Sequence, residues 1–163
     1  MMILAIDPGT ATTGYAVLGY EGGEFDVVDY GAIVTESGKS AHLRLKDIYA
    51  SVCRLIRQYH PDYLVAEELF FNSNARTAIS VGQARGVCLL AAANFDISVA
   101  EYTPLQVKQA VVGYGRAEKS QVQSMIKLLL KLDELPKPDD AADALALGIC
   151  HAHSIGRDEL RRS

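Results

Sequence analysis

Four acidic residues of this chain stand at the ends of apolar runs, where a carboxylate is costly without a partner. Asp7 follows MMILAI, Glu67 follows YLVA, and Asp140 and Asp143 lie in PDDAADALAL. Several carboxylates in one pocket repel one another, so some must take up protons unless a cation holds them. Oxygen ligands without His or Cys suit magnesium or manganese rather than zinc. This chemistry favours cleavage of a phosphodiester.

The elements that must position these residues follow an α/β pattern. Apolar runs and turn residues predict strands over residues 3–6, 14–20, 25–34, 63–66 and 97–100. Helical periodicity predicts helices from a cap at Ser40 to just before Pro61, and over residues 72–94, 104–111, 119–132 and 139–153. Three strands in a meander, followed by alternating helices and strands, predict a mixed five-stranded sheet with helices on both faces.

Composition predicts one compact domain. The chain has 163 residues, of which 49% are hydrophobic and 22% charged. We expect a single domain over residues 1–154 and a polar C-terminal tail over residues 155–163. The opening MMILAI has no basic flank and is too short to cross a membrane, so we interpret it as the first strand. Cys53, Cys88 and Cys150 are odd in number and widely spaced, which favours buried reduced thiols and a cytoplasmic location.

Charge is distributed unevenly along the chain, although the net charge is only -4. Residues 21–36 carry five acids and no Lys or Arg, which predicts a solvent-facing hairpin. Residues 104–131 carry one acid, Glu118, and five bases: Lys108, Arg116, Lys119, Lys127 and Lys131. Such a stretch could bind phosphates, and the alternative is an ordinary solvated helix face.

Five segments of the chain together point to a known family. They are AIDPGTATTGYAV, PDYLVAEELFF, GQARGV, QVKQAVVGYGRAEKSQVQ and DDAADALALGICHAH. In these segments the chain resembles the RuvC-type Holliday junction resolvases nearly from end to end. The resemblance implies a ribonuclease-H-like fold. It also implies an endonuclease that resolves Holliday junctions in homologous recombination and DNA repair, by symmetric metal-dependent nicking of two strands of like polarity.

By position, the resemblance makes Asp7, Glu67, Asp140 and Asp143 the catalytic, metal-binding set. Two Mg²⁺ ions per active site are implied, with Mn²⁺ as a substitute, and Asp7 is the best candidate to bridge them. Lys108 and Lys119 of the basic stretch also match the family. We assign Lys119 a role close to catalysis.

Both acidic neighbourhoods contain a second candidate. Glu67 is followed by Glu68, and Asp140 is preceded by Asp139, which also lies one turn from Asp143. Residue chemistry leaves both pairs open. Likeness to the family selects Glu67, and the family's Asp-Ala-Ala-Asp pattern selects Asp140.

The resemblance also implies contacts with DNA. Lys108 and Lys119 match lysines that contact the junction near the cut, and we assign Lys108 to substrate positioning. Phe70 matches a DNA-contacting aromatic that would stack on an unpaired base. Arg76 is expected to meet phosphate, and for Arg85 we favour a helix contact or a role in a dimer.

Symmetric cutting implies a homodimer, because two sites related by a two-fold axis can nick two like strands of a four-way DNA junction. The small residues of the predicted helix over 72–94 make it the candidate interface, although they would equally suit packing on the sheet. The resemblance further implies association with the branch-migration proteins RuvA and RuvB. His151 and His153 are interpreted as residues of a solvated helix end rather than metal ligands.

Two other functions remain open from the sequence. The run Asp7-Pro8-Gly9-Thr10 is also typical of the phosphate loop of actin-like and sugar-kinase ATPases, but 163 residues are too few for their paired domains. A nucleic-acid-binding module without catalysis is the second alternative, and the complete set of carboxylates disfavours it.

Overall fold

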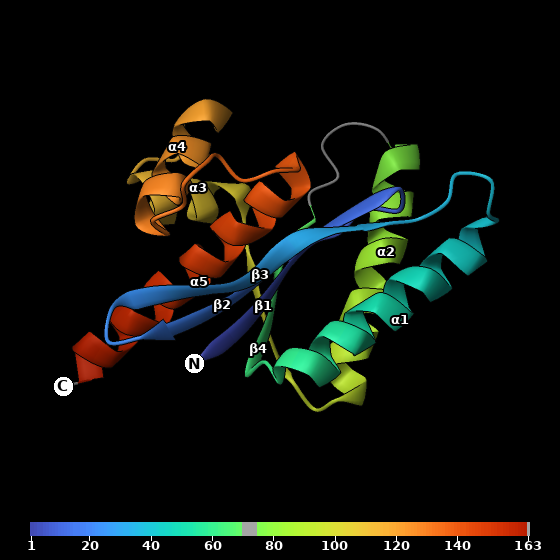
Figure 1. Cartoon of the computed structure of the whole chain (residues 1–163), viewed down its shortest axis with the longest axis horizontal. Helices are drawn as coiled ribbons and strands as arrows, with labels where there is room; N and C mark the ends of the chain where they lie inside the picture. The colour runs from blue at the N-terminus through green and yellow to red at the C-terminus, as the bar shows by residue number, and fades with distance from the viewer. Residues whose placement is uncertain (70–74, 163) are drawn as a thin grey trace.

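The computed structural model describes residues 1–69 and 75–162, which form a mixed sheet between two layers of helices (Figure 1). The strands are β1 (Met2–Asp7), β2 (Thr12–Glu21), β3 (Glu24–Val34), β4 (Tyr63–Glu67) and β5 (Ser98–Tyr102). Within the described residues their order is β3-β2-β1-β4-β5. The first three strands pair antiparallel, whereas β1, β4 and β5 run parallel.

Helices cover both faces of the sheet, as predicted (Figure 1). The helices α1 (Ala41–Tyr59) and α2 (Ala75–Asn94) pack on one face, and α3 (Pro104–Val112), α4 (Lys119–Leu129) and α5 (Asp139–Arg162) on the other. Alternate residues of β1 supply the two cores: Leu4 and Ile6 face the first helix layer, and Ile3 and Ala5 face the second. The central strand is therefore buried on both sides.

Two predicted helix ends were wrong. The helix α4 ends at Leu129 rather than residue 132, and Lys131 adopts a left-handed φ of 54° that stops further helix. The helix α5 continues to Arg162, well past the predicted end at residue 153. The polar sequence after His153 contains Arg, Glu and Leu, which are good helix formers, so polarity there did not mean irregular backbone.

The expectation that His151 and His153 lie at a solvated helix end was also wrong. His151 is 3% exposed and shares a hydrogen bond of 2.9 Å between its Nδ1 and Tyr102 Oη. Its ring lies 4.5 Å from that of Tyr63. His153 is half-buried, with its Nδ1 3.0 Å from the carbonyl oxygen of Ala110. Both residues lie inside α5, which packs on the sheet and on α3 at this level.

The cysteines agree with the sequence analysis, since Cys53, Cys88 and Cys150 are buried and free. None of the helices in the described part of the chain is long and apolar enough to cross a membrane.

Candidate active site

Asp7 and Glu67 emerge side by side from adjacent parallel strands. Ile6 of β1 pairs with Ala66 of β4, so the residues that follow them end the two strands at the same edge. Asp7 lies two residues after Ala5 on β1, so both side chains point to the same face of the sheet. Ala5 packs in the core beneath α5. Glu67 therefore shares the α5 side of the sheet with Asp7.

The structure places Glu67, and not Glu68, in the site. Glu67 lines a cavity above the ends of the strands, whereas Glu68 is exposed and its N–H donates to the carbonyl of Tyr102 at 2.9 Å. Period-two alternation turns consecutive side chains to opposite faces, and the position of α5 identifies which face is the cavity side.

The first turn of α5 lies directly against β2. Gly14 of β2 pairs with Asp7 of β1, and a Cβ at Gly14 would come within 2.0 Å of the carbonyl oxygen of Asp140. Only a residue without a side chain permits this approach. The contact brings Asp140 and, one turn later, Asp143 to the end of β1.

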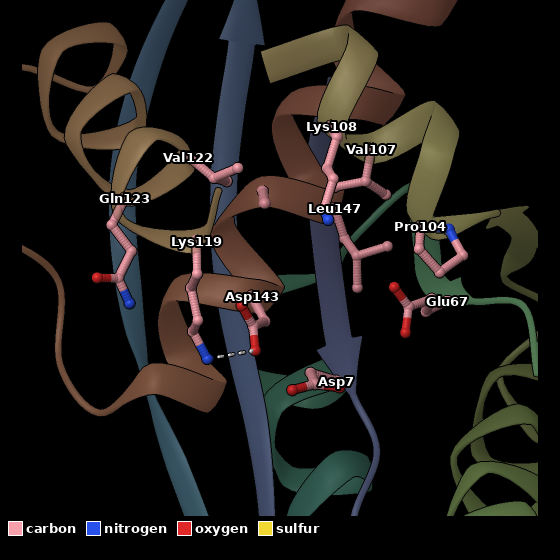
Figure 2. A pocket seen from close by; sticks show the side chains of 11 residues that line it. Asp7, Glu67, Pro104, Val107, Lys108, Lys119, Val122, Gln123, Asp143 and Leu147 are labelled. Carbon is pink, nitrogen blue, oxygen red and sulfur yellow. Dashed lines mark ion pairs between the residues drawn. The ribbon is translucent and has the colours of Figure 1, made fainter. Parts of the chain in front are cut away.

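The cavity has a volume of about 260 Å³ and combines carboxylates with lysines (Figure 2). Figure 2 shows Asp7, Glu67 and Asp143 approaching it from three separate elements, with the Lys119 side chain reaching toward Asp143. The complete lining consists of Asp7, Glu67, Pro104, Val107, Lys108, Lys119, Val122, Gln123, Asp143, Ala146 and Leu147. Asp140 is not part of this lining, and its main chain lies against Gly14 of β2.

The carboxylates perturb one another strongly. Burial and, after it, the negative charges of Asp143, Asp140 and Glu67 raise the pKa of Asp7 to about 7. The Lys119 ammonium acts on the Asp7 pKa in the opposite direction. Crowding and burial of this kind raise the cost of ionising Asp7, and a bound cation would lower that cost.

The same effects act on the neighbouring acids. Burial and then the charge of Asp143 raise the pKa of Glu67, whereas Lys108 lowers it. Burial also raises the pKa of Asp143, opposed by Lys119 and reinforced by Asp140. Asp7, Glu67 and Asp143 thus each have a nearby lysine that offsets part of the repulsion between the carboxylates.

Lys119 and Lys108 reach the cavity from different helices. Lys119 begins α4, and its Nζ lies 3.2 Å from Asp139 Oδ2 and 3.6 Å from Asp143 Oδ2. Lys108 lies on α3 and lines the same cavity. Asp139, exposed at the start of α5, also accepts from Gln123 Nε2 at 3.2 Å, so it holds the α4 side chains rather than facing the cavity.

The donor set fits a hard divalent cation in chemistry and in electrostatics. Carboxylate oxygens are the ligands that Mg²⁺ prefers, and the raised pKa of Asp7 reflects negative charge that a cation would neutralise. Across the residues that the structure describes, no three His, Cys, Asp or Glu side chains already converge so that they could hold an ion.

Of the remaining predicted residues that the structure describes, Arg76 and Arg85 are not part of the cavity lining. Phe70 falls outside the described residues. Arg76 is exposed in the first turn of α2. Arg85 contacts the site indirectly, since its Nε donates to the carbonyl of Glu67 at 3.2 Å.

Sequence reasoning missed two contributors to the site. Gln123 lines the cavity and bonds to Asp139, but a single Gln on an amphipathic helix carries no distinctive signal. Gly14 allows α5 to approach β1. A glycine inside a strand pattern was the available signal for that close approach.

Comparison with known proteins gives a consistent result. The family model described as crossover junction endodeoxyribonuclease RuvC matches residues 3–151. A crossover junction endodeoxyribonuclease RuvC from Alkaliphilus oremlandii is 59% identical over 154 residues, which cover 94% of each chain.

Solved structures give the same answer. The RuvC structure from Thermus thermophilus has a TM-score of 0.90 at 34% identity and covers 97% of both chains. A T. thermophilus RuvC in complex with a Holliday junction substrate has a TM-score of 0.88 at 32% identity, over 96% of both chains. The expected ribonuclease-H-like fold is thereby confirmed. On sequence and structure alike, the chain belongs to the RuvC family of crossover junction endodeoxyribonucleases.

Proposed function

We propose that this protein resolves four-way DNA junctions in homologous recombination and DNA repair, by symmetric metal-dependent nicking of two strands of like polarity. As a RuvC family member the chain is a nuclease that hydrolyses DNA phosphodiester bonds. The observation that carries the proposal is the cavity at the ends of β1 and β4, where three carboxylates and two lysines meet. The junction bound by the T. thermophilus relative supports the choice of substrate.

Asp7, Glu67, Asp140 and Asp143 are the proposed metal ligands. Two Mg²⁺ ions, with Mn²⁺ as substitute, would supply an activated water and stabilise the leaving oxygen. Asp7 is central in this set, because the charges of the other three acids all act on it. Its position at the end of the middle strand makes it the proposed shared ligand.

Lys119 and Lys108 have distinct proposed roles. Lys119 lies within 3.6 Å of Asp143, so its ammonium is already held where negative charge would develop on a transferring phosphoryl group. We assign Lys119 a catalytic role. Lys108 lies on the opposite wall beside Glu67 and is assigned to gripping the DNA backbone.

Contacts farther along the DNA are assigned to Phe70 and Arg76. Arg76 is exposed at the start of α2, shortly after the chain leaves β4 at Glu67. An exposed guanidinium there is available to a phosphate of the bound DNA. Phe70 is proposed to stack on an unpaired base at the crossover.

A homodimer through α2 would provide the two sites that symmetric nicking requires. The helix exposes Ile79 and Leu90, which are 62% and 52% exposed, on a surface otherwise rich in small residues. Association with RuvA and RuvB, and a cytoplasmic location where the DNA substrate is found, complete the proposal.

The decisive experiment is strand-resolved cleavage of a synthetic four-way junction and of a linear duplex of the same sequence in Mg²⁺. We expect symmetric, ligatable nicks in the junction alone from the wild type and none from Asp7→Asn. Because the substitution removes negative charge near phosphates, junction binding by Asp7→Asn should be unchanged or tighter. Loss of binding by a folded Asp7→Asn protein would contradict the role assigned to Asp7.

The same experiment separates the alternative functions. A nucleic-acid-binding module would bind the junction tightly without cutting it, and Asp7→Asn would then change nothing. A phosphate-loop ATPase would neither bind nor cut the junction, and would hydrolyse ATP instead.

A further inference from the structure

Arg85 on α2 joins the two strands that end beside the cavity. Its Nε donates to the main-chain carbonyl of Glu67 at 3.2 Å. Its Nη2 forms an ion pair with Glu101 on β5, the strand next to β4. The Arg85 side chain is 17% exposed, so this guanidinium is largely withdrawn from solvent and held at both ends.

The carbonyl that Arg85 contacts lies where the sheet stops. Glu67 is the last residue of β4, and the N–H of Glu68 still bonds to the carbonyl of Tyr102 on β5. The peptide between Glu67 and Glu68 is therefore held through its N–H by β5, and its carbonyl bonds to Arg85. The guanidinium supplies a donor to the carbonyl of Glu67, and it thereby fixes the peptide from which the Glu67 side chain enters the cavity.

The contact acts on the backbone and not on the carboxylate. Burial, Asp143 and Lys108 shift the pKa of the Glu67 carboxyl, and the bonds of Arg85 go to the Glu67 carbonyl and to Glu101 instead. This arrangement needs a guanidinium with separate donors, because its Nε bonds to the carbonyl of Glu67 while its Nη2 pairs with Glu101. A lysine ammonium is a point charge and does not reproduce this fork.

We propose that Arg85, held in place by Glu101, is a positioning residue that fixes the main chain of Glu67 so that its carboxylate can bind the metal ion. The inference rests on the proposed metal role of Glu67. It gives the GQARG segment a function within each subunit, separate from any contact between subunits. Second-layer partners of this kind typically change metal affinity or activity by about 10- to 100-fold when they are removed.

The test is Mn²⁺ binding by isothermal titration calorimetry, together with the Mn²⁺ dependence of junction cleavage by the full-length protein. The variants are Arg85→Gln, Arg85→Lys, Glu101→Gln and Glu67→Gln. Arg54→Gln is the matched control, because it removes an exposed arginine of α1 that lies beside β2 and β3, at the other end of the sheet from β5.

We expect Arg85→Gln to weaken Mn²⁺ binding about 10- to 100-fold and to raise the Mn²⁺ needed for half-maximal cleavage by a similar factor. Arg85→Lys should lose most of the affinity as well, since charge alone does not restore the fork. Glu101→Gln should have a smaller effect in the same direction, and combining it with Arg85→Gln should add little. Junction binding measured in Ca²⁺ should be unchanged in all of these variants.

Several results would overturn the inference. Wild-type Mn²⁺ affinity in Arg85→Gln, or full restoration by Arg85→Lys, would remove the positioning role. A monomeric Arg85→Gln protein with normal Mn²⁺ affinity would assign the residue to assembly. If Arg85→Gln does not fold, Glu101→Gln carries the test, and normal Mn²⁺ affinity in that variant would refute the idea. Normal metal binding and cleavage by Glu67→Gln would instead refute the proposed function of the site itself.

Discussion

Gly14→Ala tests whether the contact between β2 and α5 assembles the active site. The φ of Gly14 lies outside the left-handed region, so the backbone itself would accept alanine. The new Cβ would lie 2.0 Å from the carbonyl oxygen and 2.3 Å from the carbonyl carbon of Asp140. Both are main-chain atoms at the start of a helix, and they cannot turn aside as the end of a side chain can.

The size of the effect follows from this overlap. Real Cβ atoms do not approach closer than 3.0 Å, so the start of α5 must retreat from β2 by about 1 Å. Overpacking of this kind costs typically 1–3 kcal/mol of folding free energy. A misplacement of about 1 Å in a catalytic group can lower the rate about 100-fold. Since Asp140 and Asp143 both lie on this turn, we expect cleavage to fall by roughly that factor.

The assay is single-turnover cleavage of a labelled four-way junction at saturating protein and Mg²⁺, with urea unfolding followed by circular dichroism. Gly38→Ala is the matched control, because Gly38 is exposed and a Cβ there meets nothing within 4 Å. Junction affinity should survive in Gly14→Ala. Wild-type cleavage by a Gly14→Ala protein would refute the argument that this close approach positions the acids.

Four other predictions address separate parts of the molecule. Lys119→Ala should lower the single-turnover rate with little change in junction affinity, and weakened binding alone would move Lys119 to substrate positioning. Calcium should support junction binding but not cutting in gel assays, because its looser coordination suits two-metal chemistry poorly, and efficient cleavage would contradict a strict two-metal site. Ile79→Glu should shift sedimentation from dimer to monomer, whereas an unchanged dimer would place the interface elsewhere. Burial lowers the pKa of His151 to about 4 from the 6.5 of an unfolded chain. At this residue the unfolded state therefore binds more protons between these pH values, so the contribution of His151 to stability falls by up to about 3 kcal/mol as the pH drops through that window, while the raised pKa of Asp7 acts in the opposite direction. His151→Asn, which cannot titrate, should remove the His151 contribution, so the difference in unfolding free energy between wild type and variant should change across this window, and a constant difference would contradict the assignment.

Local sequence patterns predicted the fold class and the carboxylate chemistry of the candidate site. Apolar alternation in MMILAI and YLVA places Asp7 and Glu67 at strand ends, and the spacing of Asp140 and Asp143 places them on one helix face. These conclusions depend on local periodicity, which is readable from neighbouring residues. Likeness to the family supplied the choice of acid within each pair.

How these elements meet depends on tertiary packing, which local patterns do not show. Which face of β4 is the cavity side depends on where α5 packs, and this separates Glu67 from Glu68. The burial of His151 depends on the same packing, which polarity along the sequence did not reveal.

The positions of Gly14 and Arg85 make the same point across larger separations in sequence. In the sequence, Gly14 is only a glycine within a strand. In the folded chain it allows α5, from the far end of the sequence, to pack against that strand. The sequence favoured a helix contact or a dimer role for Arg85, whereas in the folded chain its guanidinium bonds to the end of β4. Local sequence specifies the conformation of each segment, whereas contacts between distant segments depend on the whole packed arrangement, and the active site is built from those contacts.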